Sequence, residues 1–448
     1  MVEILENKNP IEAIHTQLLA NEPKVIGSFV PSDGVAQKEA FLKGDIDNPR
    51  HTYSKLDNTD FSVLKNSIQE LGQSIVSNPN LPTKHQPAYE QFTDGYLQRA
   101  ELLRLAQAYN HAETDAERQE LAELYMAQNI EAYGKPDEQT YRALIGERLQ
   151  RITSKNLDGE AVQMRDELFK LVDFDGHDGS LERFRPSPET IEWMHGVVGS
   201  LYGGMLSHVP GDKDTFTPAE VQSIFTDIIE QEFGEATVGW TVDIEEAVSI
   251  NVKTVEKRIV IPKREVMRSR SMVRKLVVHE IGVHMLRSVM GAETDLKPLA
   301  SGLNDYYDSE EGLGVVMEQA LESEAVDRGV DHYITAGLAY YDKKDFRGAF
   351  EVKWRLALLD KLTDDGQVMP DQIDKARTTA YAQTMRCFRG TDDLPLFKDL
   401  AYFNGSNDTW RHLEEIRGDD TRFMFVLLGK LDPSNKDHER LVYETRTV

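Results

Sequence analysis

The chain has 448 residues, 29% of them charged and 40% apolar, a balance typical of a globular protein with room for about three domains. Its formal net charge of −26 argues against general binding to nucleic acid or to an anionic membrane, because a polyanion gains nothing from an acidic surface. The single cysteine, Cys387, excludes an intrachain disulfide and a cysteine metal cluster. Because no apolar run approaches the roughly 18 residues of a membrane-spanning helix, we expect a soluble, cytoplasmic protein.

The first part of the chain is expected to hold an arm and a helical layer. Residues 1–55 mix Pro, Asn and Asp with isolated apolar residues, which predicts an extended arm. Residues 56–180 have apolar residues at helical spacing, which predicts a helical domain. The segment 174–179 is rich in Gly and Asp and is interpreted as the boundary loop, because it lacks the spacing and terminal Glu of an EF-hand.

Residues 181–448 are predicted to form a third domain with helices and a small sheet. Helical patterns cover 188–206 and 218–233, and the second begins with a capping box from Thr217 to Glu220. Residues 240–244, 250–254 and 258–261 are rich in β-formers and predict three short strands. Helical patterns return at 312–328, 346–362, 370–386 and 409–416. The expected class is α+β and mostly helical.

The segment 273–290 predicts a buried helix that carries His279, Glu280 and His284. In the common H-E-x-x-H zinc motif, a spacing of four brings both imidazoles to one face of the helix. The spacing here is five, which on a regular helix leaves the side chains about 140° apart. A π-bulge absorbs one residue and realigns them, and Gly282 would tolerate it. We therefore expect both histidines to bind Zn²⁺ across a bulged turn, the alternative being two core histidines.

A catalytic zinc needs a third protein ligand and an open position. The acidic segment at 308–311 supplies two candidates, Glu310 and Glu311, at the start of a predicted helix. The structural alternative for Glu311 is a capping box with Asp308 as its N-cap. Glu280 lies next to a predicted ligand and is the candidate general base, because a buried carboxylate without a partner would otherwise be costly.

Three separated motifs resemble the tyrosine carboxypeptidase-like zinc metallopeptidases, which include bacterial members with a QEGLA motif. They are HEIGVHMLR at 279–287, GLNDYYDSEEGLG at 302–314, and RCFRG with LFKDLAYFNG between 386 and 405; DNPRHTYSKLD at 47–57 is a weaker match. The resemblance implies a zincin-like core with the sheet beside the HExxxH helix. It also implies a zinc carboxypeptidase with ligands His279, His284 and Glu311 and with Glu280 as base. Gly314 and Glu310 depart from the usual motif, and we expect neither to touch the chemistry.

A carboxypeptidase must bind the free C-terminal carboxylate of its substrate, and basic side chains do this. By resemblance, the candidates are Arg386, Arg389 and Lys398. Structural ion pairs are an equal alternative for each of them, with Asp392, Asp393 or Asp399 as partner. Tyr402 could line an aromatic side-chain pocket together with Tyr381 and Phe403, although core packing is the more common role for such residues.

The function predicted from the sequence is a zinc metallocarboxypeptidase that removes a C-terminal Tyr or Phe by attack of a Glu280-activated, zinc-bound water. A zinc endopeptidase or aminopeptidase on the same site is one alternative. A non-catalytic, acidic helical interaction protein with a degenerate metal site is another. Residues 253–275 contain nine bases and two acids. They predict either a basic rim that attracts an acidic peptide tail or a solvated face paired with acids elsewhere.

Overall fold

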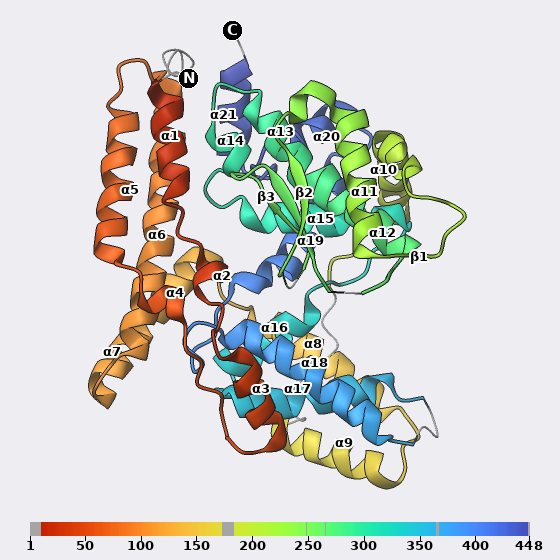
Figure 1. Cartoon of the computed structure of the whole chain (residues 1–448). Coiled ribbons are helices and arrows are strands. Elements are labelled where there is room, and N and C mark those ends of the chain that lie inside the picture. Colours follow the sequence, from red (N-terminus) through yellow and green to blue (C-terminus); the bar gives the residue numbers. More distant parts are fainter. Residues whose placement is uncertain (1–9, 173–182, 248, 265, 364–366, 447–448) are drawn as a thin grey trace.

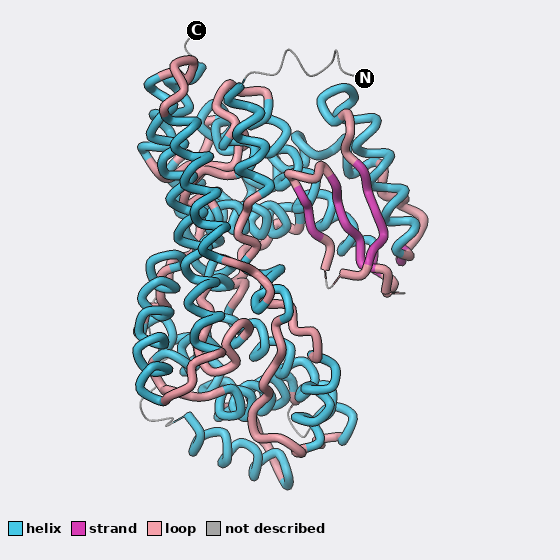
Figure 2. Tube along the Cα trace, turned by 60° about the vertical axis from the view of Figure 1, so that its left-hand side comes forward, coloured by secondary structure: helices cyan, strands magenta, loops and turns pink. Residues whose placement is uncertain are grey.

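The computed structural model describes residues 10–446 apart from 173–182, 248, 265 and 364–366. Helices make up most of this part of the chain, together with two small sheets. Figure 2 shows the strands on one side of the upper part and helices elsewhere. The predicted α+β, mostly helical class is confirmed, whereas the loop predicted at 174–179 lies outside the described residues.

A layer of long helices forms the left side of the molecule in Figure 1. It consists of α1 (Pro10–Ala20), α2 (Val25–Ser28), α4 (Ser54–Asp57), α5 (Phe61–Val76), the 3-10 turn η1 (Thr83–His85), α6 (Gln86–Asn110) and α7 (Asp115–Tyr133). Polar caps set its boundaries: the Asp60 carboxylate accepts the first free N–H groups of α5, and the Thr114 hydroxyl accepts one at the start of α7. The helical layer predicted after residue 56 is thus present.

The lower part of Figure 1 is entirely helical among the described residues. It joins segments that are far apart in the sequence: α3 (Gly34–Lys43), α8 (Glu138–Thr153), α9 (Gly159–Val172), α16 (Val330–Tyr340), α17 (Phe346–Lys361) and α18 (Pro370–Phe388). Their apolar faces form one core cluster, in which Leu149 and Ile152 share the interior with Leu338 and Leu359. Burial of this shared face is what holds the lower part together.

The upper part holds the two sheets and the remaining helices. Its helical elements are α10 (Pro188–Ser207), α11 (Pro218–Ile228), η3 (Ile229–Phe233), η4 (Gly234–Thr237), α12 (Arg270–Leu276), η5 (Val277–Met285), α13 (Leu286–Ala292), α14 (Pro298–Ser301), α15 (Tyr307–Leu321), η6 (Lys398–Leu400), α19 (Ala401–Glu415), α20 (Asp420–Val426) and α21 (Lys436–Arg446). The capping box predicted at Thr217 and Glu220 forms at the start of α11. The helices predicted at 188–206, 346–362 and 370–386 are present with ends shifted by two residues at most.

The main sheet has the order β2-β4-β3, with β2 (Thr241–Glu245) parallel to β4 (Arg258–Pro262) and β3 (Asn251–Lys253) antiparallel to β4. A second sheet pairs β1 (Thr215–Phe216) with β5 (Arg268–Ser269). Ile259 and Ile261 of β4 are fully buried and share a core cluster with Val277 and Ile281 of η5. The sheet therefore packs beside the helix that carries the histidine motif, where the sequence predicted three strands.

The N-terminal arm is helical, and the expectation of an extended segment over residues 1–55 was wrong for its described part. Helices α1, α2 and α3 occupy much of residues 10–43, and α3 ends at Gly44 in the left-handed conformation typical of a helix C-terminus. Phe41 is buried edge-on against Phe346 and Phe350, with ring centroids 5.1 and 4.8 Å apart. Such short helices depend on packing against distant residues, which periodicity over a few residues does not reveal.

The hydrophobic clusters also cross the predicted boundary near residue 180. The lower core combines α8 and α9 with α16, α17 and α18, which the sequence had assigned to the third domain. Composition could not show this division because it follows contacts between distant segments. None of the described helices combines the length and apolar character that a membrane crossing requires.

Candidate metal centre

The helix that carries the histidine motif is distorted as the five-residue spacing predicted. Residues Val277–Met285 form a π-helix, η5, between the α-helices α12 and α13. The rings of His279 and His284 lie with centroids 4.8 Å apart, so the extra residue in the turn brings both imidazoles to one side. On a regular helix the same two side chains would diverge.

Tyr202 of α10 supports the distorted turn from behind. Its buried hydroxyl donates a hydrogen bond of 3.0 Å to the carbonyl oxygen of Gly282. A Cβ on Gly282 would lie 2.8 Å from the Tyr202 ring, which is closer than carbon atoms normally approach. Gly282 is therefore needed for the approach of this tyrosine, a more specific reason than tolerance of the bulge.

Helix α15 brings a carboxylate to the two histidines. One ligand atom from each of His279, His284 and Glu311 lies within 4.8 Å of the other two. The alternative capping box does not form, because α15 begins at Tyr307 and its N-cap, Tyr306, makes no side-chain cap bond. The two imidazoles and one carboxylate form the donor set that catalytic zinc sites use, so these residues fit that ion.

Two further carboxylates hold the histidine rings. The Nδ1–H of His279 donates to Glu318 Oε1 at 2.6 Å, and the Nδ1–H of His284 donates to Glu310 Oε1 at 2.8 Å. Because each Nδ1 carries the proton and bonds a carboxylate, the Nε2 of each ring keeps its lone pair free to bind a metal ion. A carboxylate behind a ligating histidine is the usual means of fixing its tautomer and orientation.

Glu310 belongs to a buried charge network and not to the ligand group. Its carboxylate, 3% exposed, accepts hydrogen bonds from Arg287, Lys430 and His284. Burial alone would raise the pKa of Glu310, but the charges of Lys430 and Arg287 hold it well below its usual value. The sequence left the choice between Glu310 and Glu311 open. Of the two, Glu311 is the one whose carboxylate lies within 4.8 Å of a ligand atom of each histidine.

The titration of the candidate base reflects its surroundings. Burial raises the pKa of Glu280, while the nearby His279 and His284 act to lower it. Burial lowers the pKa of His279, but its bond to Glu318 and the charge of Glu280 outweigh this and bring it to about 9. Among the described residues, no hydrogen bond or ion pair holds the Glu280 carboxylate, so it remains available to a small molecule at the site.

The two departures from the usual motif both lie against the histidines, although we expected neither to touch the chemistry. Glu310 binds His284, as described above. Gly314 lies against the ring of His279, where an added Cβ would be 2.7 Å from Nε2 and Cε1. The sequence could not reveal these contacts because they depend on how closely α15 approaches η5.

A second close approach fixes α15 against α19. A Cβ on Gly312 would lie 2.1 Å from the backbone of Gly405, and one on Gly405 would lie 1.9 Å from the carbonyl oxygen of Asp308. These glycines therefore allow the two helix backbones to touch. Because Glu311 stands between Gly312 and the start of α15, this crossing also sets the position of the third candidate ligand.

Of the candidate substrate residues, Arg386 lies on α18, Arg389 directly follows it, Lys398 begins η6 and Tyr402 lies on α19. Arg386 donates from Nε to Asp399 at 2.8 Å, and Arg389 donates to the same carboxylate at 3.1 Å. For these two arginines the structural ion pair is thus present. Arg389 is largely buried, whereas the Arg386 side chain is 40% exposed and its guanidinium lies 5.5 Å from the Tyr402 ring centroid.

Lys398 differs from the two arginines because no ion pair holds it among the described residues. Its Nζ lies 3.2 Å from the centroid of the Tyr307 ring, a cation–π contact. Burial lowers the pKa of Lys398 to about 8, although the charges of Glu311 and Asp399 act in the opposite direction. Burial raises the pKa of Tyr402, and the charge of Glu311 raises it further. Lys398 and Tyr402 therefore both lie near the candidate ligand Glu311.

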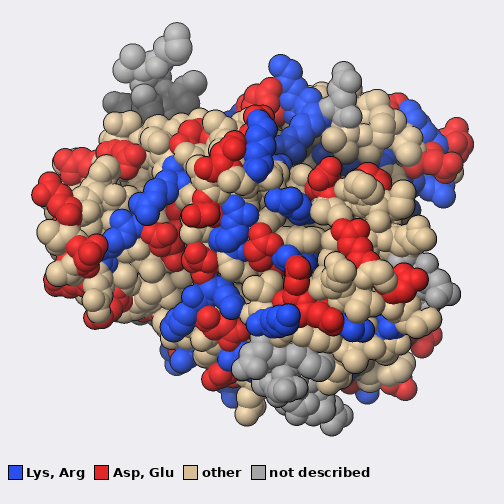
Figure 3. Space-filling model, turned by 90° about the horizontal axis from the view of Figure 1, so that it is seen from below, with Lys and Arg blue, Asp and Glu red and all other residues tan. Residues whose placement is uncertain are grey.

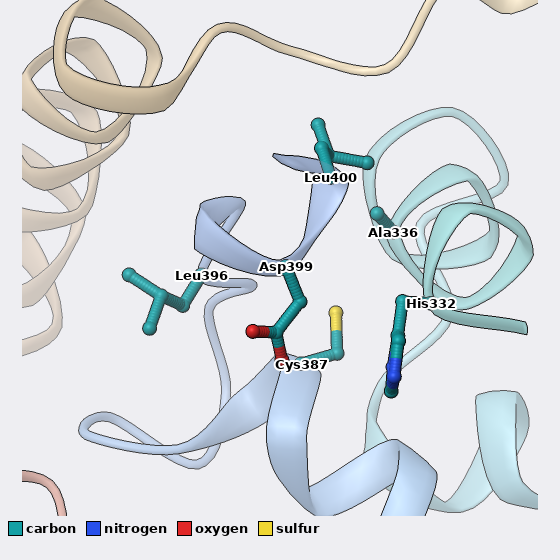
Figure 4. Close-up of a pocket in the computed structure, with 6 residues that line it drawn as sticks. All are labelled: His332, Ala336, Cys387, Leu396, Asp399 and Leu400. Carbon is teal, nitrogen blue, oxygen red and sulfur yellow. The ribbon is translucent and has the colours of Figure 1, made fainter. Parts of the chain in front are cut away.

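The aromatic residues proposed with Tyr402 belong to the core instead. Tyr381 and Phe403 are 4% and 5% exposed and pack in the lower cluster. A small cavity next to Asp399 does not provide a side-chain pocket either, because its volume of about 10 Å³ suits one water molecule. Figure 4 shows its lining, which includes Cys387 and His332; burial lowers the pKa of His332 to about 4.

Four of the nine bases in the segment 253–275 lie within ion-pair distance of an acid in the described chain: Lys253, Arg258, Lys263 and Lys275. Arg258 bonds Glu245 and Glu256, and Lys275 lies 3.9 Å from Glu322. The other five bases, among them Lys257 and Arg274, have no acidic partner in the described chain, so these contacts do not decide between a basic rim and a face paired with acids. On the face drawn in Figure 3, basic and acidic side chains likewise lie interspersed.

Some residues of the site were missed by the sequence reasoning, among them Glu318, Tyr202 and Lys430. Glu318 follows Glu311 by seven residues, two helical turns along the same face, and this spacing could have revealed it. Tyr202 and Lys430 come from distant segments and gave no local signal.

The weaker motif at 47–57 anchors the N-terminal region. The Asp392 carboxylate accepts from the Tyr53 hydroxyl at 2.6 Å and from the ring of His51 at 2.8 Å. His51 Nε2 lies 3.3 Å from the Tyr381 hydroxyl. This buried cluster connects the N-terminal region to the segment after α18. The residues of the motif at 47–57 therefore have a structural role.

A comparison with known protein families matches part of the chain. The family model described as microtubule-associated tyrosine carboxypeptidase matches residues 207–331. This segment contains the main sheet, η5 and α15, and therefore both motifs of the candidate metal centre, whereas the motif between 386 and 405 lies outside it. Comparison with curated proteins and with solved structures found no match. Over residues 207–331 the chain is thus similar to the tyrosine carboxypeptidase-like family, as its motifs predicted.

Proposed function

We propose that the protein is a zinc-dependent metallocarboxypeptidase with a zincin-like core. One observation carries the proposal: His279, His284 and Glu311 converge within 4.8 Å. The carboxylates on both Nδ1 atoms support it, because they leave the Nε2 atoms free to bind a metal. The family match over the same segment supports a peptidase that acts on protein C-termini.

The chain's own residues have distinct roles in this proposal. His279, His284 and Glu311 would hold the ion, which when bound would polarise the scissile carbonyl and make a water molecule more acidic. Glu280 would accept the proton of the attacking water and deliver it to the leaving amine. Its position next to His279, with no internal partner among the described residues, leaves it free for this transfer.

Lys398 is the best candidate to bind the substrate's terminal carboxylate. It is the one of the three predicted bases without an ion pair in the described chain, and it lies close to Glu311. Arg386 could add a second contact, because only its Nε is bonded to Asp399. Arg389 is assigned a structural role. Lys398→Met should raise KM for a peptide with a free C-terminus much more than it lowers kcat, because it removes a binding contact.

The first experiment combines metal analysis with peptide hydrolysis. The wild-type protein should bind one zinc ion and release Tyr or Phe from a peptide with a free C-terminus. Glu280→Gln should keep the metal and lose at least about 100-fold in kcat, since general base catalysis typically supplies that much. Glu123→Gln, an exposed site on α7, is the matched control and should behave as wild type. Full activity in Glu280→Gln, or no bound zinc in the wild type, would overturn the proposal.

Capped peptides separate the carboxypeptidase from the other enzymes that such a site could support. Amidation of the C-terminus should abolish cleavage, whereas acetylation of the N-terminus should have no effect. Cleavage of the amidated peptide would indicate an endopeptidase, or an aminopeptidase if acetylation blocked it. Tightly bound metal without hydrolysis of any peptide would favour a non-catalytic protein. Peptides with acidic tails test whether Lys257, which bonds the Val238 carbonyl oxygen and has no acidic partner in the described chain, attracts such substrates.

A further inference from the structure

A second concave surface lies away from the candidate metal centre, between α10 and α20 on the outer side of the upper part (Figure 1). This groove has a volume of about 760 Å³, the size of a site for several side chains. Its lining residues are Glu189, Glu192, Trp193, Gly196, Val197, Ser200, Leu201, Asp420, Phe423 and Met424. The proposed peptidase function makes no use of it.

The floor of the groove is an apolar stripe at helical spacing. Trp193, Val197 and Leu201 follow one another every four residues on α10 and are only partly buried. Met424 of α20, 47% exposed, continues the stripe on the opposite wall. At 1.5 Å per residue, the stripe from Trp193 to Leu201 is about 12 Å long, and the whole groove lining on α10, from Glu189 to Leu201, is about 18 Å long. This length matches a helix of about 12 residues lying along α10.

The rim of the groove is acidic on both sides. Glu189 and Glu192 stand one turn apart on α10, and Asp420 of α20 lines the same groove. Glu189 lies 3.9 Å from Arg417, an exposed and weak pair. In the described part of the chain, neither Glu192 nor Asp420 has a hydrogen bond or an ion pair. Uncompensated acids around an apolar floor attract a cationic and amphipathic ligand.

The groove also contains open space beside Gly196 that no atom of the described chain fills. Gly196 lines the groove inside a 20-residue helix, where glycine is less favourable than alanine. A Cβ added at Gly196 would meet nothing within 4 Å, so no contact within the described chain requires glycine. This differs from Gly282 and Gly314, each of which has a close neighbour. A small residue at Gly196 would allow another backbone to approach the stripe.

We propose that this groove binds an amphipathic helix of a partner protein, about three turns long, with Lys or Arg residues flanking its apolar stripe. Such an occupant satisfies the three observations together: the apolar floor, the acidic rim and the open space at Gly196. The binding mode is a helix in a groove, with apolar anchors at intervals of three and four residues. The inner face of α10 meanwhile keeps its contacts with the helices of the metal centre, through Tyr202 and His195.

The probe is a fluorescein-labelled helical peptide of 14 residues, acetylated and amidated so that it is not a substrate. It carries Leu and Phe on one face and Lys on both flanks. Fluorescence anisotropy with the full chain should show saturable binding. A shuffled peptide of the same composition, and one with Glu in place of Lys, should each bind at least ten times more weakly.

Variants of the protein locate the site. Gly196→Leu fills the groove, and the double variant E192K/D420K reverses two exposed charges on its rim. Each should weaken the basic peptide at least tenfold. The matched control, E120K/E123K on α7, changes the net charge equally at exposed positions and should keep Kd within twofold. Circular dichroism and peptidase activity should be unchanged in the rim variant, because its residues lie outside the candidate metal centre.

Four outcomes would overturn the proposal. Equal binding of the shuffled and ordered peptides would show general attraction to an acidic protein and no groove. Undiminished binding by the rim variant, or absence of binding by the wild type, would exclude a basic helix as occupant. Light scattering that shows a dimer lost in Gly196→Leu would assign the groove to a second copy of the chain.

Discussion

Replacement of Gly314 by alanine tests whether the space beside His279 is needed by the metal centre. Gly314 lies within α15, where helix propensity alone predicts that alanine stabilises the protein by about 1 kcal/mol. The geometry predicts the opposite. An added Cβ would lie 2.7 Å from Nε2 and Cε1 of His279 and 2.9 Å from Nδ1.

The size of the expected disturbance follows from these distances. Ordinary contacts between such atoms begin near 3.4 Å, so the ring or the helix must move by about 0.7 Å. The ring cannot retreat freely, because its Nδ1–H is bonded to Glu318 at 2.6 Å. Metal–ligand distances tolerate only about 0.2 Å. We therefore expect Gly314→Ala to weaken zinc binding at least about tenfold, as loss of an outer contact to a ligating histidine does.

Two assays separate the effect of the steric clash with His279 from the effect of alanine's higher helix propensity. Competition with a chromogenic chelator measures the zinc affinity, and urea unfolding of the metal-free protein measures stability independently of the ion. The control is Gly199→Ala on α10, where a Cβ would meet nothing within 4 Å. This control should raise the free energy of unfolding by about 0.5 to 1 kcal/mol and leave zinc affinity unchanged. Equal stabilisation by both alanines, with unchanged zinc affinity, would refute the reasoning.

Three further predictions concern the packing around the site. Gly405→Ala places a Cβ 1.9 Å from the Asp308 carbonyl oxygen and should destabilise the protein by roughly 3 kcal/mol or more; a thermal midpoint within 2 °C of wild type would contradict this. Asp392→Asn weakens the buried cluster with Tyr53 and should cost about 1 to 3 kcal/mol, with faster proteolysis of the first 60 residues as the measurement. Burial, with a smaller effect of a nearby lysine, lowers the pKa of His15 to about 4, so the unfolded state takes up its proton first as the pH falls below about 6.5. The stability present above that pH is lost towards pH 4, and His15→Phe should remove up to about 1.4 kcal/mol per pH unit of this slope in urea unfolding at pH 7 and 5.

The sequence predicted local features wherever the signal was periodic or depended on spacing. The five residues from His279 to His284 were sufficient to predict the π-helix, because only a distorted turn brings both rings together. The three strands and the capping box at Thr217 were also found in place. Each of these features is determined by a few residues that are neighbours in the sequence.

Contacts between distant segments could not be predicted in this way. The arm looked irregular because α1 and α3 are short and depend on packing against later segments: Ile11 and Leu18 of α1 pack in a cluster with residues of α5 and α6, and Phe41 of α3 packs against residues about 300 positions away. The ion pairs of Arg386 and Arg389 with Asp399 were one alternative among several, and only the path of the chain after α18 decides among them. The role of Lys398 likewise emerged only once its neighbours were known.

The segment from Glu310 to Gly314 shows why a motif can be longer than the chemistry it contains. Within this segment only Glu311 would bind the proposed ion, yet Glu310 bonds His284, Gly312 allows the close approach of α19, and Gly314 leaves space for the ring of His279. Each of these contacts fixes one distance between α15 and a neighbouring helix. Because a metal centre tolerates errors of only about 0.2 Å, a shift at any of these positions reaches the ligands. Substitutions at the two glycines should therefore impair metal binding even though neither residue offers a ligand atom.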